Sequence, residues 1–141
     1  MKNRPVQIRS FAATDLEGAF ELLTAHGWAH RIPNRPFLER LITASQRVAV
    51  ATSQGQVIGF ARAITDGLSN GYLSMVVVAP QWRGQGIGKS LVDEIVKDDD
   101  SITWVLRASR AQAPAFFAKL GFVPSNDAME RARREAPTGY F

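Results

Sequence analysis

The chain has 141 residues, of which 45% are hydrophobic and 21% charged, and its formal net charge is +4. This length and composition are typical of a soluble globular protein, so one domain over residues 1–141 is expected. No apolar run is long enough to span a membrane, and no apolar core follows the N-terminus as in an export signal. We therefore predict a cytoplasmic protein with no membrane partner. The absence of cysteine excludes disulfides, thiolate metal ligands and a catalytic thiol.

The positive charge does not by itself point to nucleic acid. Most of the 17 basic residues are arginines, and they are scattered from Arg4 to Arg134. The one dense cluster, Arg131, Arg133 and Arg134, is more readily explained by a solvated tail than by a phosphate-binding patch. A nucleic-acid binder needs basic and aromatic residues on one face, whereas a basic surface also attracts small polyanions. We expect no nucleic-acid partner.

The chain begins with the patterns of a strand and a helix. The alternation over 6–8 predicts a short strand. Thr14 and Glu17 have the spacing of a capping box, which predicts that the first helix begins there. Apolar residues then recur at helical spacing up to Leu23, and Gly27 is a natural stop.

A loop rich in rings is expected after this helix. It carries His26, Trp28 and His30. Asn34 and Pro36 then predict the start of a second helix, because asparagine caps helices and proline is tolerated in their first turn.

Three strands are predicted next. Residues 47–52 and 57–64 have strand patterns, and the turn residues at 53–56 predict that the two strands form a hairpin. A second turn, over 66–71, carries an Asp-Gly signal. It leads to an almost unbroken apolar run over 72–78, which is typical of a strand buried on both faces.

The rest of the chain alternates helix and strand patterns. We expect, in order, a helix over 87–96, a strand over 102–107, a helix over 114–120 closed by Gly121, and an extended piece beginning at Phe122 and Val123. The acidic run Asp98-Asp99-Asp100 opposes a helix dipole, so it predicts a helix stop rather than a metal site, and no metal is expected. Strands and helices interleaved around one central sheet place the chain in the α/β or α+β class.

A glycine-rich loop connects the apolar run 72–78 to the following helix. Gly84, Gly86 and Gly88 allow backbone conformations that a Cβ excludes, and they let a ligand approach the main chain. Amides at the start of the next helix, together with the positive end of its dipole, favour a bound phosphate. The loop is therefore predicted to hold a phosphorylated ligand.

Spacing excludes two familiar phosphate loops. The nucleoside-triphosphate loop has four residues between its first glycine and its Gly-Lys-Ser/Thr, but only three separate Gly84 from Gly88. The dinucleotide fingerprint Gly-x-Gly-x-x-Gly is one residue longer than Gly84-Gln85-Gly86-Ile87-Gly88. The pattern that fits is Arg/Gln-x-x-Gly-x-Gly/Ala after an apolar strand, with Arg83, Gly86 and Gly88 in the three fixed places.

At this loop the chain resembles the GCN5-related N-acetyltransferases (GNAT). The segment 76–91 is similar to that family's acetyl-CoA motif over its whole length, and 113–122 is similar to its later helix and Gly-Phe turn. The earlier hairpin, with Ile58-Gly59-Phe60 on a strand, matches in order and spacing. The resemblance is close over residues 45–125 and extends to the remainder only in the order of elements.

The resemblance implies an acyl-CoA N-acyltransferase-like fold, with a single mixed, mostly antiparallel central sheet, flanking helices and a splayed pair of strands. It also implies acetyl-CoA as co-substrate. Backbone amides of the loop would hold the pyrophosphate, and main-chain groups of Val76 and Val78 would pair with the pantetheine arm. The implied cofactor-binding residues are Val76, Val77, Val78, Arg83, Gly84, Gln85, Gly86, Ile87, Gly88, Lys89, Ser90 and Phe117. The amide of Val76 or Val77 would stabilise the oxyanion that forms when an amine attacks the acetyl carbonyl.

Two positions depart from the family's pattern. Many members have tyrosine at the place of Phe117, where the hydroxyl is thought to protonate the leaving thiolate, and phenylalanine cannot do this. Members often have asparagine at the place of Arg110. Three interpretations follow: another group donates the proton, the thiolate leaves without help, or the protein binds acetyl-CoA without transferring the acetyl group.

Three side chains are candidates for proton transfer. His26 and His30 flank Trp28 where this fold usually forms the acceptor wall, and histidine titrates near neutrality. Both residues are more readily explained as part of a loop surface. Tyr72 starts the central strand and is a candidate acid, although tyrosine at such a place is more often a packed aromatic residue.

The leading hypothesis is direct transfer of an acetyl group to a small primary amine or an amino-acid-like acceptor. The alternatives are a non-catalytic acyl-CoA-binding or sensing module and a protein or peptide N-acetyltransferase. A homodimer is suggested only by analogy with other proteins of this fold.

Overall fold

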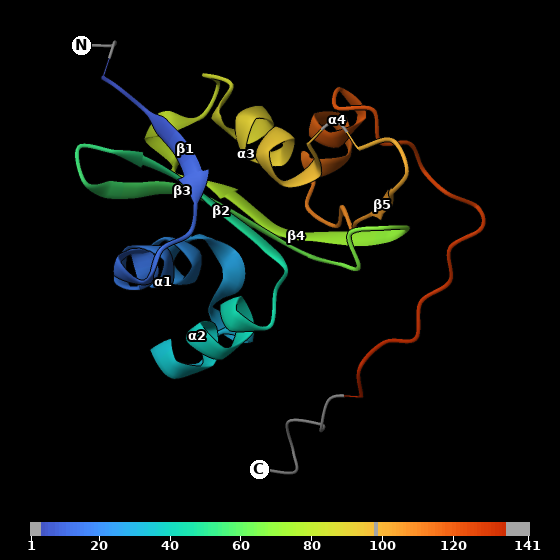
Figure 1. The fold of residues 1–141 in the computed structure, drawn as a ribbon, viewed down its shortest axis with the longest axis horizontal. Coiled ribbons are helices and arrows are strands. Elements are labelled where there is room, and N and C mark those ends of the chain that lie inside the picture. Colours follow the sequence, from blue (N-terminus) through green and yellow to red (C-terminus); the bar gives the residue numbers. More distant parts are fainter. Residues whose placement is uncertain (1–3, 98, 135–141) are drawn as a thin grey trace. The chain divides into compact units, whose positions relative to one another are not determined.

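The computed structural model describes residues 4–97 and 99–134, and the chain forms two compact units, residues 1–107 and 108–141. The first unit contains β1 (Gln7–Ser10), α1 (Leu16–Leu23), α2 (Arg35–Thr43), β2 (Arg47–Ser53), β3 (Gln56–Thr65), β4 (Asn70–Val78), α3 (Ile87–Val96) and β5 (Thr103–Val105) (Figure 1). The second contains α4 (Ala113–Ala118). Asp98, part of the predicted helix stop, lies outside the described residues.

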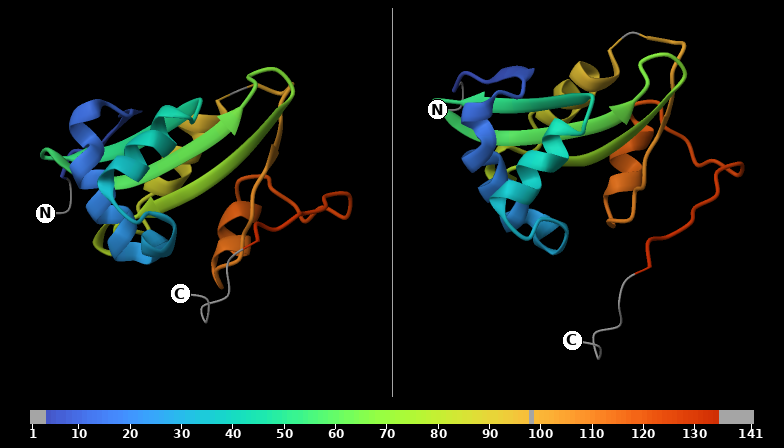
Figure 2. Two further views of the ribbon diagram at one scale, coloured as in Figure 1. Left: turned by 90° about the horizontal axis from the view of Figure 1, so that it is seen from below. Right: turned by 60° about the horizontal axis from the view of Figure 1, so that its bottom comes forward.

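The five strands form one sheet in the order β1-β2-β3-β4-β5. The first three pairings are antiparallel, and β5 joins β4 in parallel. Helices α1 and α2 cover one face of this sheet and α3 covers the other (Figures 1 and 2). The predicted fold class, a mixed and mostly antiparallel sheet flanked by helices, is confirmed.

The helices pack tightly on the central strand β3 because glycine stands at both contacts. A Cβ on Gly59 would lie 2.9 Å from Leu91 of α3, and a Cβ on Gly18 of α1 would lie 2.9 Å from Val57. Residues 58–63 are buried without interruption, since both faces of β3 are covered. The core of the first unit is therefore centred on this strand.

The capping box predicted at Thr14 is wrong. Thr14 lies inside a 3-10 turn, Ala13–Asp15, that precedes α1. The carboxylate of Asp15 instead accepts the amide of Ala12 at 2.8 Å and two hydrogen bonds from Arg9, at 2.7 and 2.9 Å. Arg9 holds the pKa of this buried carboxyl below its usual range, so the start of α1 is tied to β1 by charge.

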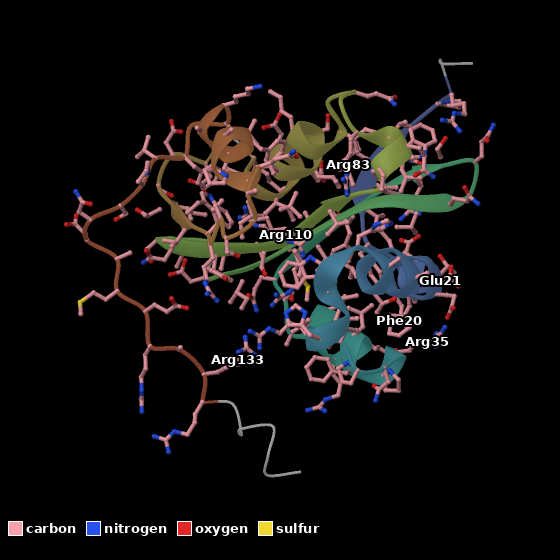
Figure 3. The ribbon with its side chains drawn as sticks, turned by 180° about the vertical axis from the view of Figure 1, so that it is seen from behind. Phe20, Glu21, Arg35, Arg83, Arg110 and Arg133 are labelled. Carbon is pink, nitrogen blue, oxygen red and sulfur yellow. The ribbon has the colours of Figure 1, made fainter. Side chains whose placement is uncertain are left out.

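Glu17, the other half of that predicted box, binds across to α2. It forms an ion pair with Arg35, whose Nη2 lies 2.7 Å from the carboxylate. The Arg35 guanidinium also lies 4.4 Å from the ring centre of Phe20, and Figure 3 shows this cluster on α1 and α2. The pair joins the two helices on one face of the sheet.

The predicted second helix is confirmed, but the loop before it is more regular than expected. Asn34 accepts the amide of Phe37 at 2.9 Å, as a helix cap does. Between α1 and α2 the chain forms a π turn, Thr24–Trp28, and a 3-10 turn, Ala29–Arg31. Gly27 has a φ of 101° inside the first turn, which confirms it as the break in the helix.

The turn between β3 and β4 is organised by one carboxylate. Asp66 accepts the amides of Leu68, Ser69 and Asn70 and the hydroxyl of Ser69. These donors, the Ser69 hydroxyl foremost, lower the pKa of Asp66 well below its usual range. The predicted turn is confirmed with this physical cause, but it covers 66–69, because Asn70 and Gly71 already belong to β4.

In the second unit, α4 ends near Gly121, which has a φ of 96°, and the amide of Phe122 bonds to the carbonyl of Phe117 at 3.1 Å. The extended piece expected after this turn does not form a strand: none is found over 119–134. Val123 is 80% exposed and Pro124 has no amide to donate, so neither burial nor pairing stabilises a strand there.

Candidate functional site

The central strand β4 has an open edge. On one side it pairs with β3 from Gly71 to Val78, but on the other it pairs with β5 only over Asn70–Tyr72. In the described part of the chain no strand pairs with the 73–78 stretch on that side. This confirms the splayed pair of strands, and it leaves main-chain groups of β4 available for another extended molecule.

The register shows which main-chain groups face this edge. The amide of Ala79 donates to the carbonyl of Ile58 at 2.8 Å, toward β3. Bonding groups alternate in direction along a strand, so Val77, paired with Phe60, also turns toward β3. Val76 and Val78 therefore turn toward the open edge.

A bulge lies within the same stretch of β4. The pairing passes from Phe60–Val77 to Arg62–Ser74, so β4 has one residue more than β3 between these pairs. Met75 takes up the irregularity with a φ of 58°, which is uncommon for a residue with a side chain. The bulge re-aims the amides next to it, a feature that the apolar run did not predict.

The side chain of Arg83 bonds to the end of β4. Its Nε donates to the carbonyl of Val78 at 2.9 Å, and Figure 3 labels this arginine. Since this carbonyl faces the open edge, the guanidinium lies where β4 meets the glycine-rich loop.

The loop supplies free amides at the start of α3. Gly86 is the N-cap with a φ of 82°, and the amide of Ser90 donates to its carbonyl at 3.0 Å. The amides of Ile87, Gly88 and Lys89 come before that bond and so have no partner within the helix. The first turn contains no acidic residue, and such a helix start favours an anion.

Glycine is needed at 84 and 86 because of the backbone conformation there, and not because a side chain would collide with a neighbour. The φ angles of Gly84 and Gly86 are 76° and 82°, and a Cβ at either position would meet nothing within 4 Å. Gln85 between them and Lys89 beyond them are exposed, and Lys89 pairs with Asp93 at 2.8 Å. The predicted phosphate loop is thus open to a ligand along its main chain.

The candidate proton-transfer residues lie on different elements. Tyr72 is on β4, between Ile64 of β3 and Val105 of β5. His26 is in the π turn after α1, and His30 follows with its ring stacked on Trp28, at 6.4 Å between ring centres. No described contact brings these three together, so their catalytic roles remain predictions.

Phe117 lies in the second unit, on α4. Its ring meets those of Phe116 and Phe122 edge to face, at 4.9 and 5.7 Å between centres. Its predicted contact with the cofactor stays a prediction. Arg110 precedes the same helix.

Sequence reasoning missed Arg62 of β3. This arginine is only 7% exposed, and its Nε donates to the hydroxyl of Ser45 at 2.9 Å. Burial lowers its pKa, which the nearby Tyr72 partly offsets. The sequence feature that could have identified it is an arginine inside the apolar run Phe60-Ala61-Arg62-Ala63.

Two further properties of the described residues bear on the site. They contain no group of three or more histidine and carboxylate side chains that could hold a metal ion. None of their helices is long and apolar enough to cross a membrane.

Known proteins resemble the chain over this same region. The family model "Acetyltransferase (GNAT) domain" matches residues 44–124. A rice protein (Oryza sativa subsp. japonica) named serotonin N-acetyltransferase 2, chloroplastic, is 28% identical over 127 residues. That alignment covers 86% of this chain but 62% of the rice protein, so the chain spans less than two thirds of this relative.

Solved structures share the fold. A GNAT-family protein from Xanthomonas campestris pv. campestris superposes with a TM-score of 0.75 at 26% identity, over 92% of this chain and 94% of its own. A protein of unknown function from meticillin-resistant Staphylococcus aureus reaches 0.77 at 19% identity, over 94% and 100%. With the open edge of β4, the loop and the family match in agreement, this chain belongs to the GNAT acetyltransferase family.

Proposed function

We propose that the protein is an acetyl-CoA-dependent N-acetyltransferase that transfers the acetyl group directly to a small primary amine or amino-acid-like acceptor. The observation that carries the proposal is the continuity of the open edge of β4 with the free amides at the start of α3. Family membership supports it. The domain is proposed to extend over residues 1–141.

The loop is proposed to bind the pyrophosphate of acetyl-CoA. The proposed donors are the amides from Arg83 to Lys89, of which that of Arg83 also donates to the carbonyl of Pro80 at 3.2 Å. The start of α3 favours phosphate, and Ser90 adds a hydroxyl in the same turn. The side chains of Arg83 and Lys89 add positive charge at an exposed position. Phe117 is proposed as a further contact by resemblance alone.

The open edge is proposed to hold the pantetheine arm, as an added strand would be held. Val76 and Val78 turn their main-chain groups toward this edge, where the carbonyl of Val78 already accepts from Arg83. The amide of Val76 lies beside the bulge at Met75. Acetyl-CoA, when bound, supplies the thioester that the amine attacks. Of the two amides considered for the oxyanion, the register favours Val76 over Val77, because Val77 faces β3.

The acceptor is proposed to lie on the face of the sheet that α1 and α2 cover. The turns with His26 and His30 join these two helices, and Tyr72 has Ile64 and Val105 beside it in the neighbouring strands. One of the three would take the proton of the amine or return one to the thiolate. The rice relative's name, serotonin N-acetyltransferase, is consistent with a small amine.

Phe117 favours a second candidate, a module that binds acyl-CoA without turnover. Its side chain cannot donate a proton to the thiolate, and its ring packs against other phenylalanines. Protein or peptide acetylation is the other alternative to the small-amine acceptor. A cytoplasmic location and a homodimer are proposed with the leading function.

A free-thiol assay tests the proposal. Acetyl-CoA is incubated with a panel of small amines, amino acids and lysine peptides, and the thermal midpoint is measured on the same samples. Thiol release with a small amine supports the transferase, and release only with peptides points to the protein acetyltransferase. Stabilisation by acetyl-CoA without thiol release favours the binding module. No stabilisation would overturn the assignment of Arg83–Ser90.

A further inference from the structure

Arg62 is a buried cation without an anion. Among the arginines of the described residues, Arg9 and Arg35 each bind a carboxylate. Arg62 is more buried than either, at 7% exposure, yet its one hydrogen bond among the described residues goes to the neutral hydroxyl of Ser45. Within the described part of the chain no carboxylate pairs with it. A buried charge without a partner is costly, so its retention calls for a physical reason.

The terminal nitrogens of this guanidinium have no hydrogen-bond partner among the described residues. Its Nε is used by Ser45, and neither Nη atom donates a hydrogen bond within the described residues. The buried side-chain atoms that lack a partner there are Ser53 Oγ and Trp104 Nε1. The Nη atoms of Arg62 are not among them, so they are not fully enclosed by protein. Their N–H groups have no partner among the described residues, and two parallel N–H groups suit a planar or tetrahedral oxyanion.

The surroundings of Arg62 point to the acceptor side of the sheet. Arg62 pairs with Ser74, the residue next to the bulge at Met75. Arg62 and Ser74 lie on the face of the sheet that α1 and α2 cover, because Arg62 bonds there to Ser45, which follows α2. The next cross-strand row on this face is Ile64, Tyr72 and Val105. The first and last of these are 47% and 43% exposed.

We infer that Arg62 binds an oxyanion group of the acceptor, so that the acceptor is an amine carrying a carboxylate or a phosphate. This inference rests on the proposed function and narrows its substrate class. Ile64 and Val105 of the next row are the exposed apolar side chains that would contact the body of such a molecule. The amine of the acceptor then points toward the bulge at Met75, which follows Ser74, the residue paired with Arg62 across the strands.

Matched pairs of amines test the inference. Each pair differs in the oxyanion alone: 5-hydroxy-L-tryptophan with serotonin, L-phenylalanine with phenethylamine, and O-phosphoethanolamine with ethanolamine. The wild type should prefer the oxyanion member of at least one pair. The first two pairs report on carboxylate and the third on phosphate.

The variant R62Q should raise the KM for the preferred oxyanion member by about 10- to 100-fold, the range expected for losing a charged hydrogen-bond donor. The KM for its neutral twin and for acetyl-CoA should not change. R62K, which keeps the charge, should recover part of the loss even if R62Q folds poorly. R40Q, which changes an exposed arginine of α2, is the control and should behave as wild type.

Two outcomes overturn the inference while the proposed function stands. One is a wild type that acetylates only amines without an oxyanion, and the other is an R62Q variant that affects both members of a pair equally. If no amine releases thiol, the proposed function fails, and calorimetric binding of the same six compounds decides the inference. Binding of an oxyanion member that R62Q removes would support it, and no such binding would overturn it.

Discussion

The Nε of Arg83 donates a hydrogen bond of 2.9 Å to the carbonyl of Val78. This contact joins the phosphate loop to the open edge of β4, so two parts of the proposed cofactor site are positioned by one side chain. The same contact explains why the first position of the motif Arg/Gln-x-x-Gly-x-Gly/Ala, here Arg83, takes arginine or glutamine. Both side chains can donate a hydrogen bond to a strand carbonyl.

Removing that donor should weaken cofactor binding. We expect R83A to raise the Kd for acetyl-CoA by about tenfold, because it removes a hydrogen bond from a charged donor near the phosphates. R83Q keeps a donor and should stay within about threefold of wild type, since only the exposed charge is lost. Calorimetric titration with acetyl-CoA measures both, and R40A is the control. Equal affinity of R83A and wild type would contradict the role of Arg83.

The ion pair between Asp15 and Arg9 should make stability fall in acid. Arg9 lowers the pKa of this carboxyl, so the stabilisation is complete above the unfolded pKa of about 3.9 and is lost as the pH falls through the lower folded value. D15N should be less stable at pH 7 by about 2 to 3 kcal/mol, because it removes the negative charge and replaces one of the two acceptor oxygens by an NH2 group that faces Arg9 or the amide of Ala12.

Urea unfolding from pH 2 to 7 checks this expectation. The wild type should lose stability below about pH 4, and D15N should lose less over the same range. D93N removes the exposed partner of Lys89, with both side chains more than half exposed, and should cost under about 0.5 kcal/mol. A D15N variant as stable as D93N would refute the importance of the buried pair.

The phosphate loop could be predicted from sequence because its signals are local. A buried strand, glycines at fixed spacing and an amphipathic helix follow one another within 72–96, and the structure reproduces them as β4, the loop and α3. The helix also ends at Val96, before the acidic run, as predicted.

Features that depend on contacts between distant segments could not be predicted in this way. The bulge at Met75 arises from the pairing of two strands, and an apolar run contains no mark of it. Thr14 and Asp15 are both good capping residues, and the choice of Asp15 depends on Arg9 in another strand. Arg62 is buried because α1 and α2 cover its face of β3, and its sequence neighbours do not reveal that no carboxylate of the described residues pairs with it.

Restoring the tyrosine that many family members carry should raise turnover. We expect F117Y to increase kcat by about tenfold or more, if its hydroxyl protonates the leaving thiolate as general acids do. F116Y adds the same hydroxyl to the neighbouring ring on α4 and should leave kcat unchanged. The free-thiol assay with the best amine measures both. An unchanged kcat in F117Y would mean that the thiolate leaves unassisted or that another group protonates it.

Alanine variants of two glycines with the same backbone conformation distinguish an effect on acetyl-CoA binding from an effect on stability. Gly86 and Gly55 have φ angles of 82° and 80°, and a Cβ at either would meet nothing within 4 Å. G86A and G55A should therefore each cost about 1 to 2 kcal/mol of stability, the strain of a side chain in the left-handed region. Gly55 lies in the turn between β2 and β3, whereas Gly86 caps α3.

Only G86A should weaken acetyl-CoA binding, by about tenfold or more, because relief of the strain tilts the free amides of the phosphate site. Thermal unfolding gives the matched loss of stability, and calorimetric titration gives the affinity. Equal affinities of the two variants would show that the amides at the start of α3 do not hold the cofactor. Loss of affinity in G86A alone, at equal stability, would assign the binding to this helix start.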